Sequence, residues 1–436
     1  MSHVRSFGTL GIVALLTLSI QGKARSDDNG ADDYRAIKTV FVIAMENHNW
    51  TQPTNQFSGP IQQIFENPNA PFINSLVNGT AVATINGQKV NISRQVAYAA
   101  NYHNVLATAG GDNPHIHPSE PNYIWSEAGT NFNIFNDADP FVPQGGATVN
   151  QPNNQENRLH LVRLLAHAGK SWRSYQEDTD LASVGGQLTN TVLPRNQWTV
   201  PLTSFSGNFV VGVNQFNGST QFNYAAKHNP QVFFTDNNGG DDPTSANPLS
   251  QNYAPLQQLF VDLANNSVAN YNWITPDQYN DMHTALEGGF LGLTGDAANI
   301  RQGDNFLSIV VPAIMASYAY RNNGAIIIWW DESEQDAAKT RLWRGLLRPM
   351  ASSPSDHANP DDFNHTIGEI VISPQAHPNV QGLPFASTVP LSHSSDLRTM
   401  QKIFHVTRPL FLGDALNAKD LSSLFGPGAI PPDDVD

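Results

Sequence analysis

Two apolar stretches of the sequence, residues 39–45 and 325–330, each end in side chains that could bind a metal ion. The four side chains that follow them directly are Glu46, Asn47, Asp331 and Glu332. Neighbouring carboxylates repel each other unless a cation or a shared proton intervenes, and carboxylate and amide oxygens suit a hard divalent cation. Either pair alone is more simply explained as the polar start of a loop. Because the same design occurs twice, we expect the two strand ends to meet and to enclose one metal ion.

A third stretch, residues 115–123, presents a serine that could act as a nucleophile. Pro118 and Pro121 fix the backbone on either side of Ser119. A hydroxyl held in such a rigid turn at the start of a helix is exposed for attack, and the backbone N–H groups of the turn can hold an anion. The alternative is that Ser119 only caps the helix. The two histidines of the stretch, His117 among them, would singly be more often structural or surface residues.

Further polar residues follow a strand that we predict over residues 267–275. Asp277, Asp281 and His283 come just past its end, and two acids and a histidine in such a place are metal-ligand types. Asp277 is the weaker candidate, because it could simply cap the turn.

Two more histidines lie next to predicted secondary structure. His393 comes just before a helix that we predict over residues 397–404, so it could point into a site at the strand ends. Lys227 and His228 are candidates for contact with a phosphate group, although a Lys-His pair before a turn is more often only solvated.

The elements that must position these residues indicate an α/β fold. Continuous apolar runs such as residues 325–330 predict strands buried on both faces, which belong to parallel sheets covered by helices. In open parallel sheets, ligands bind just beyond the carboxyl ends of the strands. A helix predicted over residues 156–168 and a strand over 172–177 form a unit that suits a doubly wound sheet. We also predict a strand at 231–234 and a helix at 304–320.

Five motifs in a fixed order resemble a known family. They are Glu-Asn at 46–47, Ser-x-Pro-Asn-Tyr at 119–123, Asn-Asp-x-His at 280–283, Trp-Asp-Glu at 330–332 and Ser-His-Ser-Ser-x-Leu-Arg at 392–398. In this order they resemble the phosphoesterase family that contains bacterial phospholipases C and secreted acid phosphatases, within the alkaline phosphatase superfamily. The resemblance spans residues 38–406 and implies an alkaline phosphatase-like α/β/α sandwich with a central, mostly parallel sheet.

The resemblance also implies roles for individual residues. Ser119 resembles a nucleophile that forms a covalent phospho-enzyme, and Asn122 would hydrogen-bond a phosphate oxygen. The residues around one metal ion would be Glu46, Asn47, Asp331 and Glu332. Asp281, His283 and His393 resemble positions that hold a second zinc in two-metal relatives. In the phospholipase C and acid phosphatase branch, by contrast, histidines contact phosphate beside a single metal.

Whether one or two ions bind stays open, and so does their identity. Oxygen ligands suit Ca, Mg or Mn, whereas histidines suit Zn or Fe. A metal-bound hydroxyl is a better nucleophile because coordination lowers its pKa, and the serine would split one displacement into two. His283 or His393 could supply the proton that the departing alkoxide needs, and we expect His117 and Lys227 to contact the substrate.

The start of the chain is typical of a secretory signal peptide. A basic residue precedes an apolar segment at 10–20, and small residues at 24–26 offer a cleavage site. We therefore expect residues 1–26 to be removed and the protein to be secreted or periplasmic; a retained anchor is the alternative. No later segment is apolar over a length that could span a bilayer. We divide the rest into a phosphoesterase domain at 36–410 and a C-terminal tail at 411–436.

Composition narrows the classes of function. The formal net charge of −15 makes nucleic-acid binding a poor hypothesis. The chain has no Cys, so an exported protein of this sequence must depend on a large core and not on disulfides. A sulfatase is set aside, because the segment around Ser119 lacks the Arg that the sulfatase motif requires.

Our leading hypothesis is a secreted, metal-dependent phosphomonoesterase that works through a phosphoserine intermediate. The alternative within the same chemistry is a phospholipase C or another phosphodiesterase, whose substrate would be a phospholipid and not a small phosphate ester. An alternative of another class is a non-catalytic exported binding protein on the same scaffold. The motifs do not separate the first two, because the loops on the leaving-group side decide between them.

Overall fold

The structure is a computed structural model that describes residues 35–51, 63–105, 118–134, 136–144, 147–150, 153–156, 159–333 and 366–433. His117 and residues 1–26, for which we expect a substrate contact and a signal peptide, lie outside the described residues. All of the described residues belong to one compact unit. Within those ranges, no helix combines the length and the apolar composition needed to cross a membrane.

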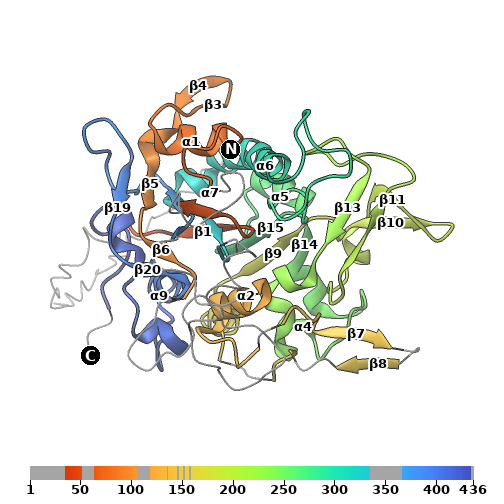
Figure 1. Ribbon diagram of the computed structural model, residues 1–436. Helices are drawn as coiled ribbons and strands as arrows, with labels where there is room; N and C mark the ends of the chain where they lie inside the picture. The colour runs from red at the N-terminus through yellow and green to blue at the C-terminus, as the bar shows by residue number, and fades with distance from the viewer. Residues whose placement is uncertain are drawn as a thin grey trace, which may run out of the picture. The chain divides into compact units, whose positions relative to one another are not determined.

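An eight-stranded sheet forms the centre of the unit (Figure 1). Its strands, in the order in which they lie side by side, are β14 (Tyr253–Pro255), β9 (Trp172–Gln176), β15 (Tyr271–Thr275), β1 (Thr39–Met45), β16 (Gly324–Trp330), β18 (Glu369–Ile372), β5 (Val96–Ala99) and β19 (Phe385–Ser387). The pairs from β14 to β16 and the pair β5–β19 are parallel, whereas β18 runs antiparallel to both of its neighbours. The mostly parallel sheet is therefore confirmed.

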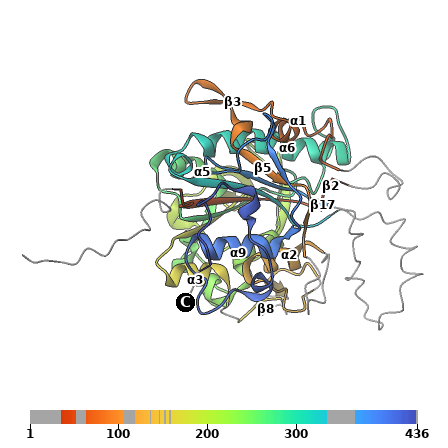
Figure 2. The ribbon, with the colours of Figure 1, turned by 90° about the vertical axis from the view of Figure 1, so that its left-hand side faces the viewer.

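Helices cover both faces of this sheet (Figure 2). On one face lie α1 (Pro71–Val77), α5 (Leu256–Asn265) and α6 (Asp296–Ala316), and on the other lie α2 (Ser119–Ala128), α3 (Leu161–His167) and α9 (His393–Ile403). Two short helices, α4 (Thr235–Asn238) and α7 (Tyr318–Arg321), connect larger elements. The expected three-layer α/β/α arrangement is confirmed.

The strands β1 and β16 lie next to each other in the interior of the sheet. Every residue of β16 is buried, as is every residue of β1 except the first, so the apolar runs are those of strands covered on both faces. The two strands pair in parallel register, with Met45 opposite Trp330. The residues that follow them, Glu46 and Asp331, are therefore brought side by side at the carboxyl edge of the sheet.

Among the described residues, six short two-stranded sheets lie outside the central sheet. They are β3 (Val82–Ile85) with β4 (Gln88–Asn91), β7 (Phe141–Gln144) with β8 (Ala147–Asn150), β10 (Leu181–Val184) with β11 (Gln187–Val192), β12 (Phe205–Asn208) with β13 (Gln221–Tyr224), β17 (Thr366–Ile367) with β2 (Asn49–Thr51), and β20 (Leu391–Ser392) with β6 (Tyr102–His103). Single 3-10 turns are η1 (Ile92–Gln95), η2 (Arg195–Gln197), η3 (Ala226–His228), η4 (Pro230–Phe233), η5 (Pro248–Asn252), η6 (Gly413–Leu416) and η7 (Leu421–Leu424).

Two local predictions are wrong. The segment 231–234 is not a strand: its first three residues belong to the turn η4, since Pro230 fixes a helical φ at the first position, and Phe234 makes only an isolated bridge with Gln155. The helix predicted at 304–320 begins earlier, at Asp296, and contains Pro312 within it.

Asp304 therefore lies inside α6 and caps a different helix. Its carboxylate accepts hydrogen bonds from the backbone N–H groups of Phe72 (3.1 Å) and Ile73 (2.8 Å), which belong to the otherwise unsatisfied donors at the start of α1. Burial raises the pKa of Asp304 to about 6, against the opposing effect of these two hydrogen bonds.

The segment at 411–433, for which we expect a tail, packs into the core of the unit. Leu421, Leu424 and Ala429 are fully buried there. The backbone N–H of Ile37 donates to the carbonyl of Ala429 over 3.0 Å, so the end of the described chain lies against the residues that precede β1.

Candidate functional site

Three carboxylates meet at the ends of β1 and β16. One oxygen from each of Glu46, Asp331 and Glu332 lies within 4.8 Å of the others, and all three side chains are buried. Both carboxylate oxygens of Asp331 are buried and have no hydrogen-bond partner among the described residues. Buried polar atoms are nearly always satisfied, and a divalent cation is the partner that three converging carboxylates fit.

Ser119 lies directly at this cluster. Its Oγ is 3.1 Å from Glu46 Oε2 and 3.2 Å from Glu332 Oε1, and the residue is 2% exposed. A hydroxyl carries one proton, so it can donate to only one of these two carboxylates at a time. Ser119 is the first residue of α2, Pro118 occupies the cap position before it, and the first-turn N–H of Glu120 donates to Asp137 and not to Ser119. The alternative explanation of Ser119 as a helix cap is therefore wrong.

The first turns of α2 add two more side chains to the site. Asn122 Nδ2 lies 3.4 Å from Glu332 Oε2, and its Oδ1 accepts from Asn104. The hydroxyl of Tyr123 donates to Glu46 Oε1 over 3.0 Å. Asn47, the expected amide ligand, is partly exposed beside the cluster.

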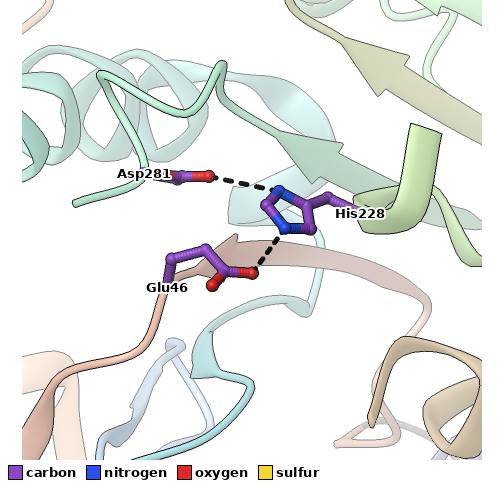
Figure 3. Close-up of side chains that lie close together, drawn as sticks. All are labelled: Glu46, His228 and Asp281. Carbon is purple, nitrogen blue, oxygen red and sulfur yellow. Dashed lines mark ion pairs between the residues drawn. The ribbon is translucent and has the colours of Figure 1, made fainter. Parts of the chain in front are cut away.

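A second group of possible metal ligands shares Glu46 with the first. His228 lies between Glu46 Oε1 (2.9 Å from Nε2) and Asp281 Oδ2 (3.4 Å from Nδ1), as Figure 3 shows. The turn η3 holds His228 in this place, and the ring of Tyr123 stacks on it at 4.9 Å. Oxygen and imidazole ligands together suit Zn or Fe.

The charged groups around Glu46 shift one another's pKa values. Burial lowers the pKa of His228, but the two carboxylates outweigh it and raise that pKa to about 9. Burial raises the pKa of Glu46, but the positive charge of His228 holds it below its usual range. Burial and the charges of Glu46 and Glu332 raise the pKa of Asp331 well above its usual value. Negative charge thus exceeds positive charge at the cluster, which favours a bound cation.

His228 is a residue that we expect, on its sequence context, to be solvated, and that expectation is wrong: it is 1% exposed. Its neighbour Lys227 forms an ion pair with Asp137 over 3.2 Å. Burial lowers the pKa of Lys227, but the charges of Asp137 and Glu46 outweigh it and raise that pKa. Lys227 is therefore a stable cation whose charge acts on the site.

His283 lies beyond His228, with the two rings 6.1 Å apart. Its Nδ1 is 2.9 Å from the hydroxyl of Thr284, and no hydrogen bond from the described residues reaches its Nε2. Burial lowers its pKa to about 4, helped by the positive charges of Lys227 and His228 and opposed by Glu46. His283 is therefore a neutral imidazole near neutral pH.

His393 is held by hydrogen bonds to residues at the end of β16. Trp329 Nε1 donates to its Nδ1 over 2.8 Å, and its Nε2 lies 2.6 Å from the backbone carbonyl of Asp331. Because an indole N–H can only donate, Nδ1 is the acceptor and Nε2 carries the proton. Burial lowers the pKa of His393 to about 3. In this arrangement the neutral ring supports the backbone of Asp331, whereas the sequence suggests a metal ligand or a proton donor.

The structure thus gathers most of the expected residues and adds two. Those at the two ligand groups or in hydrogen-bond contact with them are Glu46, Ser119, Asn122, Asp281, Asp331 and Glu332. The additions are Tyr123 and, in a role between two carboxylates, His228, which the sequence suggests only as a possible phosphate contact. Tyr123 stands inside the Ser-x-Pro-Asn-Tyr motif, which is a signal that could have drawn attention to it, whereas nothing in the spacing around His228 marks it as buried. Together, six of these residues are called the Glu46 site below: Glu46, Ser119, His228, Asp281, Asp331 and Glu332.

Known proteins share this sequence pattern. A model of the Phosphoesterase family matches residues 21–407. The "Probable acid phosphatase" of Kluyveromyces lactis is 28% identical over 236 residues, which are 53% of this chain and 42% of that protein. The "Phosphate-repressible acid phosphatase" of Penicillium chrysogenum is 24% identical over 270 residues, which are 62% of this chain and 50% of that protein. The chain therefore matches about half the length of these two relatives.

A third relative is covered more fully. The "Phosphatidylinositol-3-phosphatase" of Mycobacterium tuberculosis is 24% identical over 365 residues, 83% of this chain and 78% of that protein. The solved structure of the lipoteichoic acid synthase LtaP from Listeria monocytogenes covers 88% of this chain at 10% identity, with a TM-score of 0.40 that is too low to carry an argument. The family match confirms the resemblance drawn from the five motifs. The name of the family describes proteins that act on phosphoric esters.

Proposed function

Because the chain belongs to the Phosphoesterase family, we propose that it hydrolyses phosphate monoesters outside the cell, in a metal-dependent reaction that passes through phosphoserine at Ser119. The observation that carries this proposal is the position of the Ser119 hydroxyl. It lies 3.1 and 3.2 Å from carboxylates that follow two different strands. A hydroxyl held among converging carboxylates, at the first turn of a helix, is placed both to enter a metal's ligand shell and to meet an anion.

Glu46, Asp331 and Glu332 are the residues that would hold the ion, with Asn47 and Ser119 as further oxygen ligands. When bound, a divalent cation supplies positive charge that lowers the pKa of the serine hydroxyl and of any water beside it. Asp281 and His228 offer ligands for a second ion that shares Glu46. With one ion, protonated His228 remains between its two carboxylates and provides positive charge itself.

The chain's own residues account for the first displacement. The Ser119 hydroxyl proton passes to Glu332, since the lowered pKa of Glu46 makes that carboxylate the weaker base, and Oγ attacks phosphorus in line with the bond to the leaving group. Asn122 donates to a phosphate oxygen, and Lys227 adds positive charge. The bond between phosphorus and the leaving oxygen breaks, and the alkoxide takes a proton from water, because the lowered pKa of His283 leaves that imidazole neutral and too weak an acid to supply one. Water then attacks the phosphoserine in the second displacement, and the serine oxygen regains a proton.

A phosphate monoester on a lipid headgroup is the second candidate substrate. The relative that matches this chain over 78% of its own length is named a phosphatidylinositol-3-phosphatase, and such a substrate needs the same chemistry at phosphorus as a small ester. Phospholipase C or other phosphodiesterase activity is the remaining alternative. It would require the site to accept a second ester oxygen in place of a charged phosphate oxygen.

A panel of substrates separates these functions. Purified protein would be given para-nitrophenyl phosphate, its bis ester, phosphatidylcholine and phosphatidylinositol 3-phosphate, each with and without EDTA. We expect turnover of the two monoesters, abolished by EDTA and restored by a divalent metal. Turnover of phosphatidylcholine or the bis ester in their place would make the protein a phosphodiesterase, and no turnover of any compound would leave a binding protein.

The matched variants are Ser119→Ala and Ser126→Ala, which make the same change in the same helix. Ser126 donates to the carbonyl of Tyr123 and touches no ligand carboxylate. We expect Ser119→Ala to lower kcat/KM by more than about 1,000-fold and Ser126→Ala to leave it almost unchanged. Full activity of Ser119→Ala would remove Ser119 from the mechanism.

A further inference from the structure

A second cluster of carboxylates lies at the same edge of the sheet, on the neighbouring pair of strands. Glu177 and Asp178 follow β9, and Asp277 comes just after β15. These strands pair in parallel, with Gln176 opposite Thr275, so their ends meet as those of β1 and β16 do. One oxygen from each of the three carboxylates lies within 4.8 Å of the others, and all three are buried. No part of the proposed reaction uses this cluster.

Two unsatisfied acids in the cluster point to a missing partner. Asp277 accepts the backbone N–H groups of Tyr279 (3.1 Å) and Asn280 (2.9 Å) through Oδ1, but its Oδ2 has no hydrogen-bond partner and the residue is 1% exposed. Asp180, two residues beyond Asp178, is fully buried, and neither of its carboxylate oxygens has a partner among the described residues. Burial raises the pKa of Asp178, and the negative charge of Asp180 contributes to that rise. Glu177, Asp178, Asp180 and Asp277 are called the Glu177 cluster below.

No ion pair among the described residues reaches any of these four acids, although other buried acids nearby have one. Asp262, which packs on the same strand β9, forms an ion pair with Arg173 and accepts from Tyr175. Unpaired buried carboxylates are strongly unfavourable. The cluster must therefore hold either protons or a cation.

We propose that the Glu177 cluster binds a divalent cation of the Ca²⁺ type in a second site, which is structural and separate from the Glu46 site. Its donors are oxygens only, which suit Ca²⁺ or Mg²⁺ better than Zn²⁺. Several carboxylates held in irregular loops match the high coordination number and flexible geometry of Ca²⁺. A cation there replaces repulsion between the two strand ends with attraction to a shared ion.

The cluster is connected to the Glu46 site through one turn of the chain. Glu177 accepts from the backbone N–H of Asp277 (2.9 Å) and from Asn280 Nδ2 (2.9 Å). The backbone N–H of Asp281 in turn donates to the carbonyl of Asp277 over 2.9 Å. An ion at the Glu177 cluster therefore fixes the turn that carries Asp281 and His283 into the Glu46 site, without itself touching a substrate.

Metal analysis and thermal unfolding of the full protein test this proposal. Wild type, Asp331→Asn and Asp277→Asn would be dialysed to equilibrium against CaCl₂, the bound Ca²⁺ counted, and the Tm compared with that in EGTA. Asp331→Asn weakens the Glu46 site, and we expect it to keep at least one Ca²⁺ per chain and a Ca²⁺-dependent rise in Tm. Asn at position 277 keeps an acceptor for the two backbone N–H groups while removing one charge, so that variant should bind one Ca²⁺ fewer than wild type and lose most of the rise.

A matched control and two contrary results complete the design. Asp262→Asn removes another buried acid beside β9, and it should lower the Tm while keeping the Ca²⁺-dependent rise. Equal Ca²⁺ binding by Asp277→Asn and wild type would overturn the proposal. Absence of Ca²⁺ from Asp331→Asn would overturn it too, whether or not Asp277→Asn folds, and would mean that the cluster holds shared protons. Neither result touches the assignment of Ser119, which the activity assays decide.

Discussion

The Glu46 site and the Glu177 cluster are built in the same way but differ in what surrounds them. Both gather carboxylates from the ends of adjacent parallel strands, where backbone direction makes side chains converge. Only the Glu46 site adds a serine hydroxyl, an imidazole between two acids and a nearby lysine. The comparison shows that a strand edge by itself gathers carboxylates, whereas the hydroxyl and the positive charge beside them at the Glu46 site come from other elements, here α2 and η3.

The largest effect should separate the two clusters directly. Asp331→Asn removes the charge of a proposed metal ligand whose oxygens have no partner among the described residues. Loss of a residue that only supports a metal ligand costs roughly 10- to 100-fold. Because Asp331 would be a ligand itself, kcat/KM should fall by more than that. Asp277→Asn should lower kcat/KM by less than about tenfold and act mainly on stability. Phosphatase assays and thermal unfolding of both variants measure this difference in kcat/KM and in stability. An equal loss of activity in the two variants would contradict the separate roles of the two clusters.

The second prediction compares two buried histidines that each lie between two carboxylates. His228 bridges Glu46 and Asp281, whereas His160 bridges Glu127 and Asp236 away from the Glu46 site. We expect His228→Gln to lower kcat/KM by about 10- to 100-fold, because it disturbs Glu46, a carboxylate that we propose as a metal ligand. His160→Gln should cost about 1–3 kcal/mol of unfolding free energy and retain most activity. A His228→Gln enzyme with wild-type kinetics would show that His228 is only structural.

The third prediction is that the contribution of His160 to the free energy of unfolding depends on pH. Burial lowers the pKa of His160, but its hydrogen bonds to Asp236 and Glu127 outweigh burial and raise it above its usual value. The folded protein therefore holds the proton more tightly than the unfolded chain, whose histidines titrate near pH 6.5. The stability from this ion pair is fully present below about pH 6.5 and is lost as pH rises through the raised pKa.

Urea unfolding of wild type and His160→Gln over a pH series measures this effect. The difference in unfolding free energy should be largest at acidic pH and should shrink as pH rises. His167→Gln is the control, because His167 is exposed at the last position of α3, the helix that begins just after His160. A difference for His160→Gln that grows with pH would contradict the assigned ion pair.

The smallest expected effect concerns the cap of α1, far from either cluster in the sequence. Asp304→Ala leaves the N–H groups of Phe72 and Ile73 without their acceptor and should cost about 0.5–2 kcal/mol of unfolding free energy. Asp304→Asn keeps one acceptor oxygen and should cost less. Urea unfolding measures both. Unchanged stability of the Ala variant would mean that water replaces the cap.

Much of the fold follows from the sequence because its central strands carry a simple signal. The runs that became β1 and β16 are apolar without interruption and end in acids, and the register of the two strands brings those acids together. The start of α6 could not be predicted, because its first residues, from Asp296, lack a strong cap. Val232, Phe233 and Phe234 are fully buried because η4 packs in the core, and burial alone does not distinguish a turn from a strand.

The candidate site was predictable where its chemistry is local in the chain and not where it depends on packing. Glu46, Asp331 and Ser119 stand out from their immediate neighbours. His228 is brought to Glu46 by η3 and by stacking on Tyr123, which are contacts between distant segments. His393 is the first residue of α9, which begins four residues earlier than expected, and the indole of Trp329 donates to its Nδ1. No spacing in a single sequence reveals that contact.

The stereochemistry at phosphorus tests the central claim most directly, since it does not require the intermediate to accumulate. A phosphate monoester made chiral with oxygen isotopes would be turned over with an alcohol as acceptor, and the configuration of the product determined. Two successive in-line displacements, first by the Ser119 hydroxyl and then by the acceptor, invert twice and predict net retention. Net inversion would mean a single direct attack by the acceptor and would contradict a phosphoserine intermediate.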